Sequence, residues 1–263
     1  MGRVYTLVNQ KGGVGKTTTA INLGAYLAHF GQRVLIVDTD PQANATSSLG
    51  VDKQTVKGGV YEALLGGAPA AALVLQNPRL KLSIVPASPS LAGAEVELVN
   101  ELGRESKLAH ALAPLVDRYD YMLIDCPPSL GLLTVNGIMA ARDGVLIPVQ
   151  CEYLALEGLG ELTHTLQRVR SALFPTLKVR GVVLTMFDPR THLSSDVVAE
   201  VRKYFNEQVF ATIIPRSVRL AEAPSYGLPV SAYAPASQAA KAYETLAREL
   251  LKSDGIPVVE SVE

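Results

Sequence analysis

Asn9-Gln10-Lys11-Gly12-Gly13-Val14-Gly15-Lys16-Thr17-Thr18 is the stretch of the chain that decides its fold. An apolar, β-prone run at residues 4–8 precedes this stretch. Apolar residues recur at helical spacing after it, at Ala20, Ile21, Leu23, Leu27 and Ala28. The pattern therefore predicts a strand, a glycine-rich loop and a helix N-terminus, in that order.

A loop of this kind suits a polyphosphate. Its backbone N–H groups point into a concavity, and the dipole of the following helix adds partial positive charge. Glycines let the backbone approach oxygen atoms that a Cβ would block. We expect Lys16 to hold the β- and γ-phosphates of a nucleotide and the Thr17 hydroxyl to ligate Mg²⁺. The predicted nucleotide contacts from the loop are Lys11, Gly12, Gly13, Val14, Gly15, Lys16, Thr17 and Thr18.

The loop is a variant of the P-loop pattern G-x-x-x-x-G-K-[ST]. Gly15, Lys16 and Thr17 fit the end of that pattern, but Gln10 stands where its first glycine should be. The dinucleotide pattern G-x-G-x-x-G does not fit, because Thr18 occupies the third glycine position.

The loop contains a second lysine, Lys11, which is typical of one family of P-loop proteins. The run from Lys11 to Thr18 resembles the deviant Walker A box of the ParA/MinD class of P-loop ATPases. In that class the first lysine reaches the phosphates of the partner subunit across a dimer that encloses ATP. The resemblance implies that Lys11 acts catalytically in trans, as an arginine finger does in other NTPases. The alternative is a solvated loop lysine.

Two carboxylates follow a buried strand predicted at residues 34–37. Ligands bind beyond the carboxyl ends of parallel strands, so Asp38 and Asp40 are expected near the phosphates. Asp40 is the residue we expect to orient or deprotonate the attacking water, and the D-x-D-P-Q box resembles the ParA family in the same place. Asp38 is expected near Mg²⁺ through water. The competing interpretation of Asp40 is a helix N-cap.

Residues 119–125 have the Walker B pattern of an apolar strand that ends in a carboxylate. Asp125 is expected to hold Mg²⁺ through water, opposite Thr17. The following D-C-P-P segment resembles the family's switch loop. No base is predicted beside Cys126, so we expect a packed thiol rather than a nucleophile.

The remaining chain alternates between strands and helices. Further strands are predicted at residues 82–86, 144–149, 179–186 and 209–214, and helices at 91–102, 106–116, 154–173, 193–205 and 237–252, with Val197, Val198, Val201 and Tyr204 of the helix at 193–205 facing inward. The fold class is therefore α/β, with a mostly parallel seven- or eight-stranded sheet flanked by helices on both faces. We draw one P-loop ATPase domain over residues 1–263, with a short acidic tail at 253–263.

Composition limits the alternatives. The chain has 263 residues, 48% of them hydrophobic, with no apolar run long enough to span a bilayer, and its first strand starts too early for a signal peptide. Cys126 and Cys151 show neither metal-ligand spacing nor a disulfide framework, which favours a reducing cytoplasm. Residues 168–219 hold nine Lys or Arg and four Asp or Glu, although the whole chain carries −1. Such a basic segment is a weak pointer to a polyanion.

The family resemblance adds site residues and partners. It implies that Met186, Pro215, Arg216 and Ser217 border adenine, and that Arg190 and Arg219 contact DNA. The alternative for Met186 is a core methionine. It also implies a homodimer with ATP and Mg²⁺, sequence-independent binding of double-stranded DNA, a ParB/Spo0J-type partner and a nucleoid-associated protein of the cytoplasm, with no membrane partner.

Three other functions are open. A MinD-like membrane-associated positioning ATPase needs a basic amphipathic C-terminal helix, whereas this tail is acidic. A redox protein like the nitrogenase iron protein needs two cluster cysteines, but Cys126 falls inside the switch motif. A metabolic ATP-dependent ligase on the same scaffold needs a second substrate pocket, which no sequence motif indicates.

Overall fold

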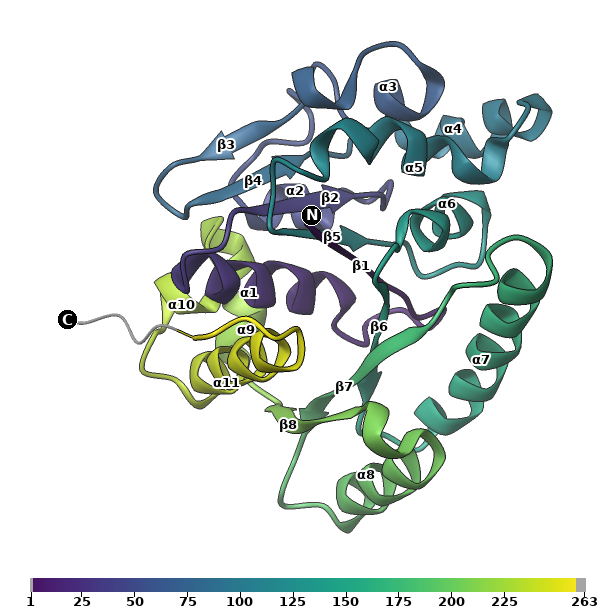
Figure 1. The fold of residues 1–263 in the computed structure, drawn as a ribbon. Coiled ribbons are helices and arrows are strands. Elements are labelled where there is room, and N and C mark those ends of the chain that lie inside the picture. The colour runs from purple at the N-terminus through teal and green to yellow at the C-terminus, as the bar shows by residue number, and fades with distance from the viewer. Residues whose placement is uncertain (1, 259–263) are drawn as a thin grey trace.

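The computed structural model describes residues 2–258, leaving aside the side chains of residues 154–157. Its centre is an eight-stranded sheet with the order β3-β4-β2-β5-β1-β6-β7-β8 (Figure 1). The strands are β1 (Arg3–Leu7), β2 (Val34–Asp38), β3 (Leu75–Asn77), β4 (Leu82–Val85), β5 (Tyr121–Asp125), β6 (Gly144–Gln150), β7 (Val179–Phe187) and β8 (Val209–Pro215). Only β3 pairs antiparallel among the described strands. The predicted fold class is confirmed.

Helices cover both faces of the sheet. They are α1 (Lys16–His29), α2 (Asn44–Ser48), α3 (Val60–Leu65), α4 (Leu91–Glu97), α5 (Lys107–Leu112), α6 (Leu132–Ala140), α7 (Leu154–Ala172), α8 (His192–Phe205), α9 (Val218–Glu222), α10 (Val230–Tyr233) and α11 (Gln238–Ser253). Helices α1 and α11 lie on one face, and α5, α6, α7 and α8 lie on the other (Figure 1). None of the described helices is both long and apolar enough to cross a membrane.

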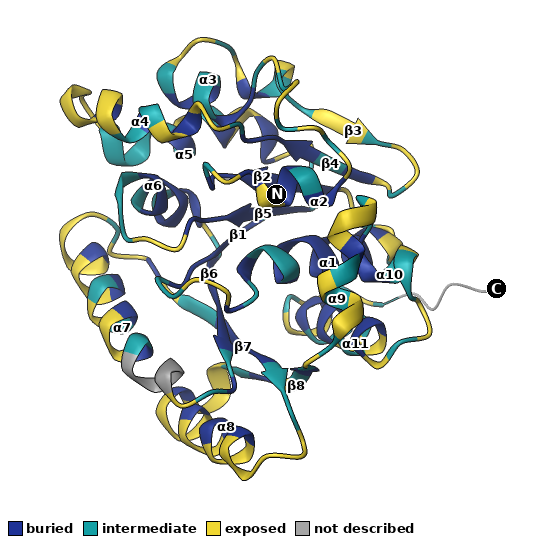
Figure 2. Ribbon diagram, turned by 180° about the vertical axis from the view of Figure 1, so that it is seen from behind, coloured by how far each residue is buried: buried dark blue, intermediate teal, exposed yellow. Residues whose placement is uncertain are grey.

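Alternation along the central strands explains the two cores. In β2, Val34 and Ile36 join the core beneath α1 and α11, whereas Leu35 and Val37 join the opposite core. Successive side chains of a strand point to opposite faces, so a strand buried on both faces reads as a continuous apolar run. Figure 2 shows the same central strands buried and the outer faces of α7 and α8 exposed.

The structure differs from the sequence-based expectation in the orientation of one side chain of α8. Tyr204 was expected to face inward, but it is 59% exposed, and Phe205 packs in the core instead. The inward stripe of α8 continues from Val201 by four residues rather than three, which places Phe205 on the buried face.

Several elements were not predicted, namely α6, β3 and the short helices α9 and α10. Helix α6 is buried on nearly every side, including at Thr134, Asn136 and Gly137, so it has no polar stripe to reveal its period. The edge strand β3 is only three residues long. The helices predicted at 91–102 and 106–116 are shorter α-helices, α4 and α5, and each continues as a 3₁₀ turn.

Sheet order brings the candidate site together. β1 lies between β5 and β6, and β5 also pairs with β2. In this register Asp125 lies beside Leu7 on one side and beside Asp38 on the other. The loop after β1 and both carboxylates therefore meet at one edge of the sheet.

Candidate nucleotide-binding site

The loop between β1 and α1 has the backbone shape of an anion cradle. Gly13 and Gly15 take positive φ angles of 75° and 91°, in the left-handed region that favours glycine. Gly15 is the N-cap of α1, and no described side chain caps this helix end. The first backbone N–H groups of α1 are therefore left for a ligand.

Three neighbouring elements fix the loop. The Asn9 amide donates to the Pro148 carbonyl in β6 (2.8 Å) and accepts from the Lys11 N–H (3.0 Å). The Thr185 hydroxyl at the end of β7 donates to the Val14 carbonyl (2.8 Å). Gln10, which replaces the first glycine of the usual motif, donates its side-chain amide to Glu161 on α7. Sequence reasoning did not select Asn9 or Thr185 as loop-fixing residues, because both act through contacts distant in the chain.

The two lysines of the loop lie in different surroundings. Lys16 is buried, and its ammonium donates to the Lys11 carbonyl (3.3 Å). Burial lowers the pKa of Lys16, and the nearby charges of Asp125 and Asp40 oppose that effect. Lys11 is half-buried, and its ammonium has no hydrogen bond or ion pair with any described residue. Lys16 therefore faces inward, while Lys11 is available to a group outside the chain.

Asp125 and Thr17 fit a magnesium ion. The Thr17 hydroxyl donates to Oδ2 of Asp125 (2.6 Å). Oδ1 of Asp125 is buried and lacks a hydrogen-bond partner among residues 2–258. Burial, with the charge of Asp38 adding to it, raises the pKa of Asp125 well above its usual range. An oxygen that is costly to leave unpaired, beside a hydroxyl, suits a hard cation with oxygen ligands.

Asp38 and Asp40 have different partners. Oδ2 of Asp38 accepts from the Thr46 N–H (2.8 Å) and hydroxyl (2.7 Å), and Oδ1 accepts from the Asp40 N–H (3.2 Å). Burial raises the pKa of Asp38 to about 6, although these bonds oppose the shift. Oδ1 of Asp40 accepts from the Gln42 N–H (2.8 Å). The N-cap of α2 is Ala43, so the interpretation of Asp40 as a helix N-cap is wrong.

A cavity of about 250 Å³ opens beside the loop. The four residues that the family resemblance places around adenine all line it, together with loop residues and side chains that the sequence did not indicate. The lining residues are Gly15, Thr18, Thr185, Met186, Ile214, Pro215, Arg216, Ser217, Leu220, Ala221 and Tyr243. Met186 has a φ of 54°, which is unusual for a residue with a side chain.

The arginines predicted to contact DNA lie on the surface. Arg190 forms an ion pair with Asp188 (2.6 Å), and Arg219 forms one with Glu222 (2.8 Å). Arg190 is 83% exposed at its side chain and Arg219 is 57% exposed. Both follow strands that end at the same edge of the sheet as the loop, β7 and β8.

The thiol of Cys126 is packed away from solvent. It is 1% exposed and accepts a weak hydrogen bond from the Thr39 hydroxyl (3.6 Å). Burial raises its pKa to about 12, so the group is a neutral thiol at physiological pH. The expectation of a packed residue rather than a nucleophile agrees with this environment.

A parallel sheet with a phosphate-type loop after its central strand, and with carboxylates at the ends of two neighbouring strands, defines the P-loop NTPase class. A family model described as an AAA domain matches residues 2–179. The chromosome partitioning protein ParA of Myxococcus xanthus is 54% identical over 254 residues, which cover 97% of this chain and 89% of that protein. The chromosome-partitioning ATPase Soj of Treponema pallidum is 52% identical over 255 residues, which cover 97% and 99%.

A solved structure has the same fold. Cobyrinic acid a,c-diamide synthase from Mycobacterium smegmatis, with a bound ATP analog and magnesium, superposes with a TM-score of 0.86 at 39% identity and covers 99% of this chain and 100% of its own. The chain belongs to the ParA/Soj family of P-loop ATPases.

Proposed function

We propose that this ATPase is a dimerisation switch in which two subunits enclose ATP. Lys11 carries the proposal, because its half-buried ammonium has no partner among the described residues and stands next to the phosphate cradle. In the dimer, Lys11 of each subunit contacts the phosphates bound by the other. A cation placed there stabilises the charge that develops during phosphoryl transfer.

Each subunit supplies the rest of its own site. Lys16 and the N–H groups at the start of α1 bind the β- and γ-phosphates, and the cavity bordered by Met186 and Pro215 takes the adenine. Thr17 and Asp125 would hold Mg²⁺, which supplies neutralisation of the phosphate charge. Asp40 orients the attacking water.

The dimer binds DNA without sequence preference. The ion pairs of Arg190 and Arg219 are exposed, and such pairs add little to stability, so a phosphate can replace the carboxylate partner. Contacts to phosphates carry no base information. Pairing two subunits doubles these contacts, which raises affinity and its salt dependence. With relatives that are partitioning proteins, we propose a role in chromosome or plasmid partitioning with a ParB-type partner on the nucleoid.

Gel-shift assays with ATP, ADP and no nucleotide, at two salt concentrations, test the DNA step. We expect ATP to strengthen binding and Arg219→Ala to weaken it, whereas Arg248→Ala, which removes a half-buried arginine of α11, should bind as the wild type does. Equal binding with ATP and ADP would exclude the switch.

Size exclusion with ATP tests the dimer. Lys11→Ala should elute as a monomer, because the cross-subunit contact to phosphate is gone. Lys252→Ala, which changes an exposed lysine at the far end of α11, should remain dimeric. A Lys11→Ala dimer would remove this residue from its proposed role.

A second candidate comes from the solved synthase. That structure is 39% identical to this chain and carries the name of a biosynthetic enzyme, so a synthase activity is the second candidate. A synthase should turn over ATP only with its acid and nitrogen donor, whereas the switch hydrolyses ATP slowly without either. Measuring phosphate release from the purified chain alone separates the two.

The residues that follow α11 do not support a membrane-associated ATPase. Ile256 and Val258 pack against the core that contains α1 and α11 instead of forming an exposed apolar face. The tail residues 259–263 lie outside the described part.

A further inference from the structure

We propose that Thr46 is a positioning residue, which acts through Asp38 to hold Asp40 for ATP hydrolysis. The inference deepens the proposed function, because it rests on the role of Asp40 in orienting water. It also gives Asp38 a task within the protein: this carboxylate supports its neighbour rather than binding the ion.

The first observation is how fully Asp38 is engaged. Its side chain is completely buried, and its two oxygens accept three hydrogen bonds. Two of them come from Thr46 and the third comes from the backbone of Asp40. A carboxylate held in this way is oriented by its donors, and both of its oxygens face protein groups.

The second observation is the position of the Thr46 hydroxyl. It donates to Asp38 at the end of β2 and accepts from the Ala87 N–H, just beyond β4 (2.9 Å). Thr46 itself lies in α2, and both Thr46 and Ala87 are fully buried. One hydroxyl thus joins three segments, and only a side chain that both donates and accepts can do so.

The third observation is the turn that carries Asp40. The Asp40 N–H donates to the Asp38 carboxylate, and the Asp40 carbonyl accepts from the Ala43 N–H (2.8 Å). Ala43 has a positive φ of 53°. A turn held in this conformation depends on bonds at both ends. Asp38 supplies the bond at the start of the turn, and Thr46 fixes Asp38. Loss of the Thr46 hydroxyl should therefore let Asp40 move without removing any group that binds the nucleotide.

Steady-state hydrolysis and nucleotide affinity test this on the full chain. Thr46→Val and the smaller Thr46→Ala should each lower kcat by about tenfold or more, since small misplacements near the chemistry are costly. Affinity for a non-hydrolysable ATP analogue should stay within about twofold, as expected when ground-state binding is spared. Thr46→Ser keeps the hydroxyl and should restore kcat.

Thr6→Val is the matched control. The Thr6 hydroxyl is equally buried and donates to the Gly137 carbonyl in α6 (2.7 Å), and it has no hydrogen bond to Asp38, Asp40 or Thr46 among the described residues. The Thr6→Val variant should have a lower melting temperature than the wild type but an unchanged kcat. The proposal is overturned if the Thr46 variants keep wild-type kcat, if kcat and affinity fall together, or if serine does not restore turnover. If Asp40→Ala hydrolyses ATP normally, the fault lies in the role proposed for Asp40.

Discussion

At the scale of single residues, Asp125 carries a cost in the nucleotide-free protein. Its Oδ1 is buried without a hydrogen bond from any residue that the structure describes, and burial already raises its pKa. An unpaired buried charge opposes folding, and sites built for ligands often accept such a cost. The carboxylate is therefore retained for binding rather than for stability.

We expect Asp125→Asn to stabilise the nucleotide-free protein by about 1–2 kcal/mol, because the amide removes the buried charge and still accepts from Thr17. The same variant should lose the extra stability that Mg²⁺ and an ATP analogue confer together. Thermal unfolding with and without both ligands measures the two effects. Asp143→Asn is the control with the opposite sign, since both oxygens of Asp143 are bonded, one to Arg3 and one to the Val4 N–H. A destabilised Asp125→Asn protein would contradict the argument.

The residues that the sequence identified belong to short motifs that can be recognised without knowing their partners in space. Lys16 and Thr17 belong to one loop, and a strand that ends in Asp125 is readable without knowing its neighbours. Thr46 and Thr185 escaped notice because neither belongs to a recognised motif. Thr46 joins Asp38 to the Ala87 N–H, 41 positions along the chain, and Thr185 bonds Val14 across 171 positions. Only the sheet order shows these pairings.

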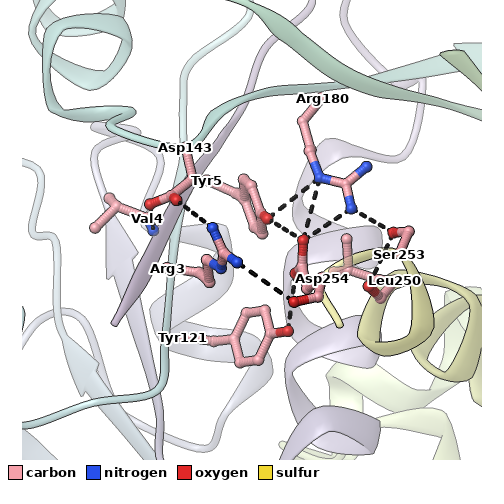
Figure 3. A network of polar contacts seen from close by, with 9 residues as sticks. All are labelled: Arg3, Val4, Tyr5, Tyr121, Asp143, Arg180, Leu250, Ser253 and Asp254. Carbon is pink, nitrogen blue, oxygen red and sulfur yellow. Dashed lines mark hydrogen bonds and ion pairs between the residues drawn. The ribbon is translucent and has the colours of Figure 1, made fainter. Parts of the chain in front are cut away.

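At the scale of elements, the residue that follows α11 attaches this helix to the sheet. The attachment lies near the starts of the strands, at the opposite edge from the candidate site. The carboxylate of Asp254 accepts from Tyr5 (2.7 Å), Tyr121 (2.8 Å) and Arg180 (2.8 Å), which come from β1, β5 and β7 (Figure 3). The side chains of Asp254 and Arg180 are 3% and 18% exposed. One residue after α11 thus joins three strands.

Removal of this carboxylate should loosen the closing helix. We expect Asp254→Ala to lower the free energy of unfolding by about 3 kcal/mol or more, because the mostly buried Arg180 loses its carboxylate partner. Glu244→Ala breaks an exposed ion pair with Arg248 on the same helix and should cost less than about 1 kcal/mol. Urea unfolding of both variants gives the comparison, and similar losses would show that the buried network adds nothing.

Hydrophobic periodicity predicted some helices of the fold and missed others. Helices with one apolar face, such as α8 and α11, were predicted because burial alternates with exposure along them. Helix α6 was missed since neighbours surround it and no polar face remains. Pattern reading therefore succeeds for helices with one exposed face and weakens for a helix that is buried on nearly every side.

At the scale of the whole molecule, the nucleotide site sets how stability depends on pH. The pKa of Asp38 is raised to about 6 and that of Asp125 is raised well above its usual range, in both cases chiefly by burial. Between about pH 4 and pH 6 the folded protein binds protons that the unfolded chain has released, so stability falls as pH rises through this window. Asp188 has the opposite sign, because Arg190 lowers its pKa to about 2, but that effect acts below pH 4.

We therefore expect the nucleotide-free protein to have a higher melting temperature at pH 5 than at pH 7. Mg²⁺ and an ATP analogue should reduce or reverse this slope, because a bound cation favours the ionised carboxylates. Asp125→Asn removes one of the two raised groups, so its nucleotide-free slope should be shallower than that of the wild type. Melting curves of both proteins at several pH values, with and without ligands, measure these slopes. If the wild type becomes steadily more stable from pH 5 to pH 7 without nucleotide, the buried carboxylates do not govern its stability, and the cost assigned to Asp125 is misplaced.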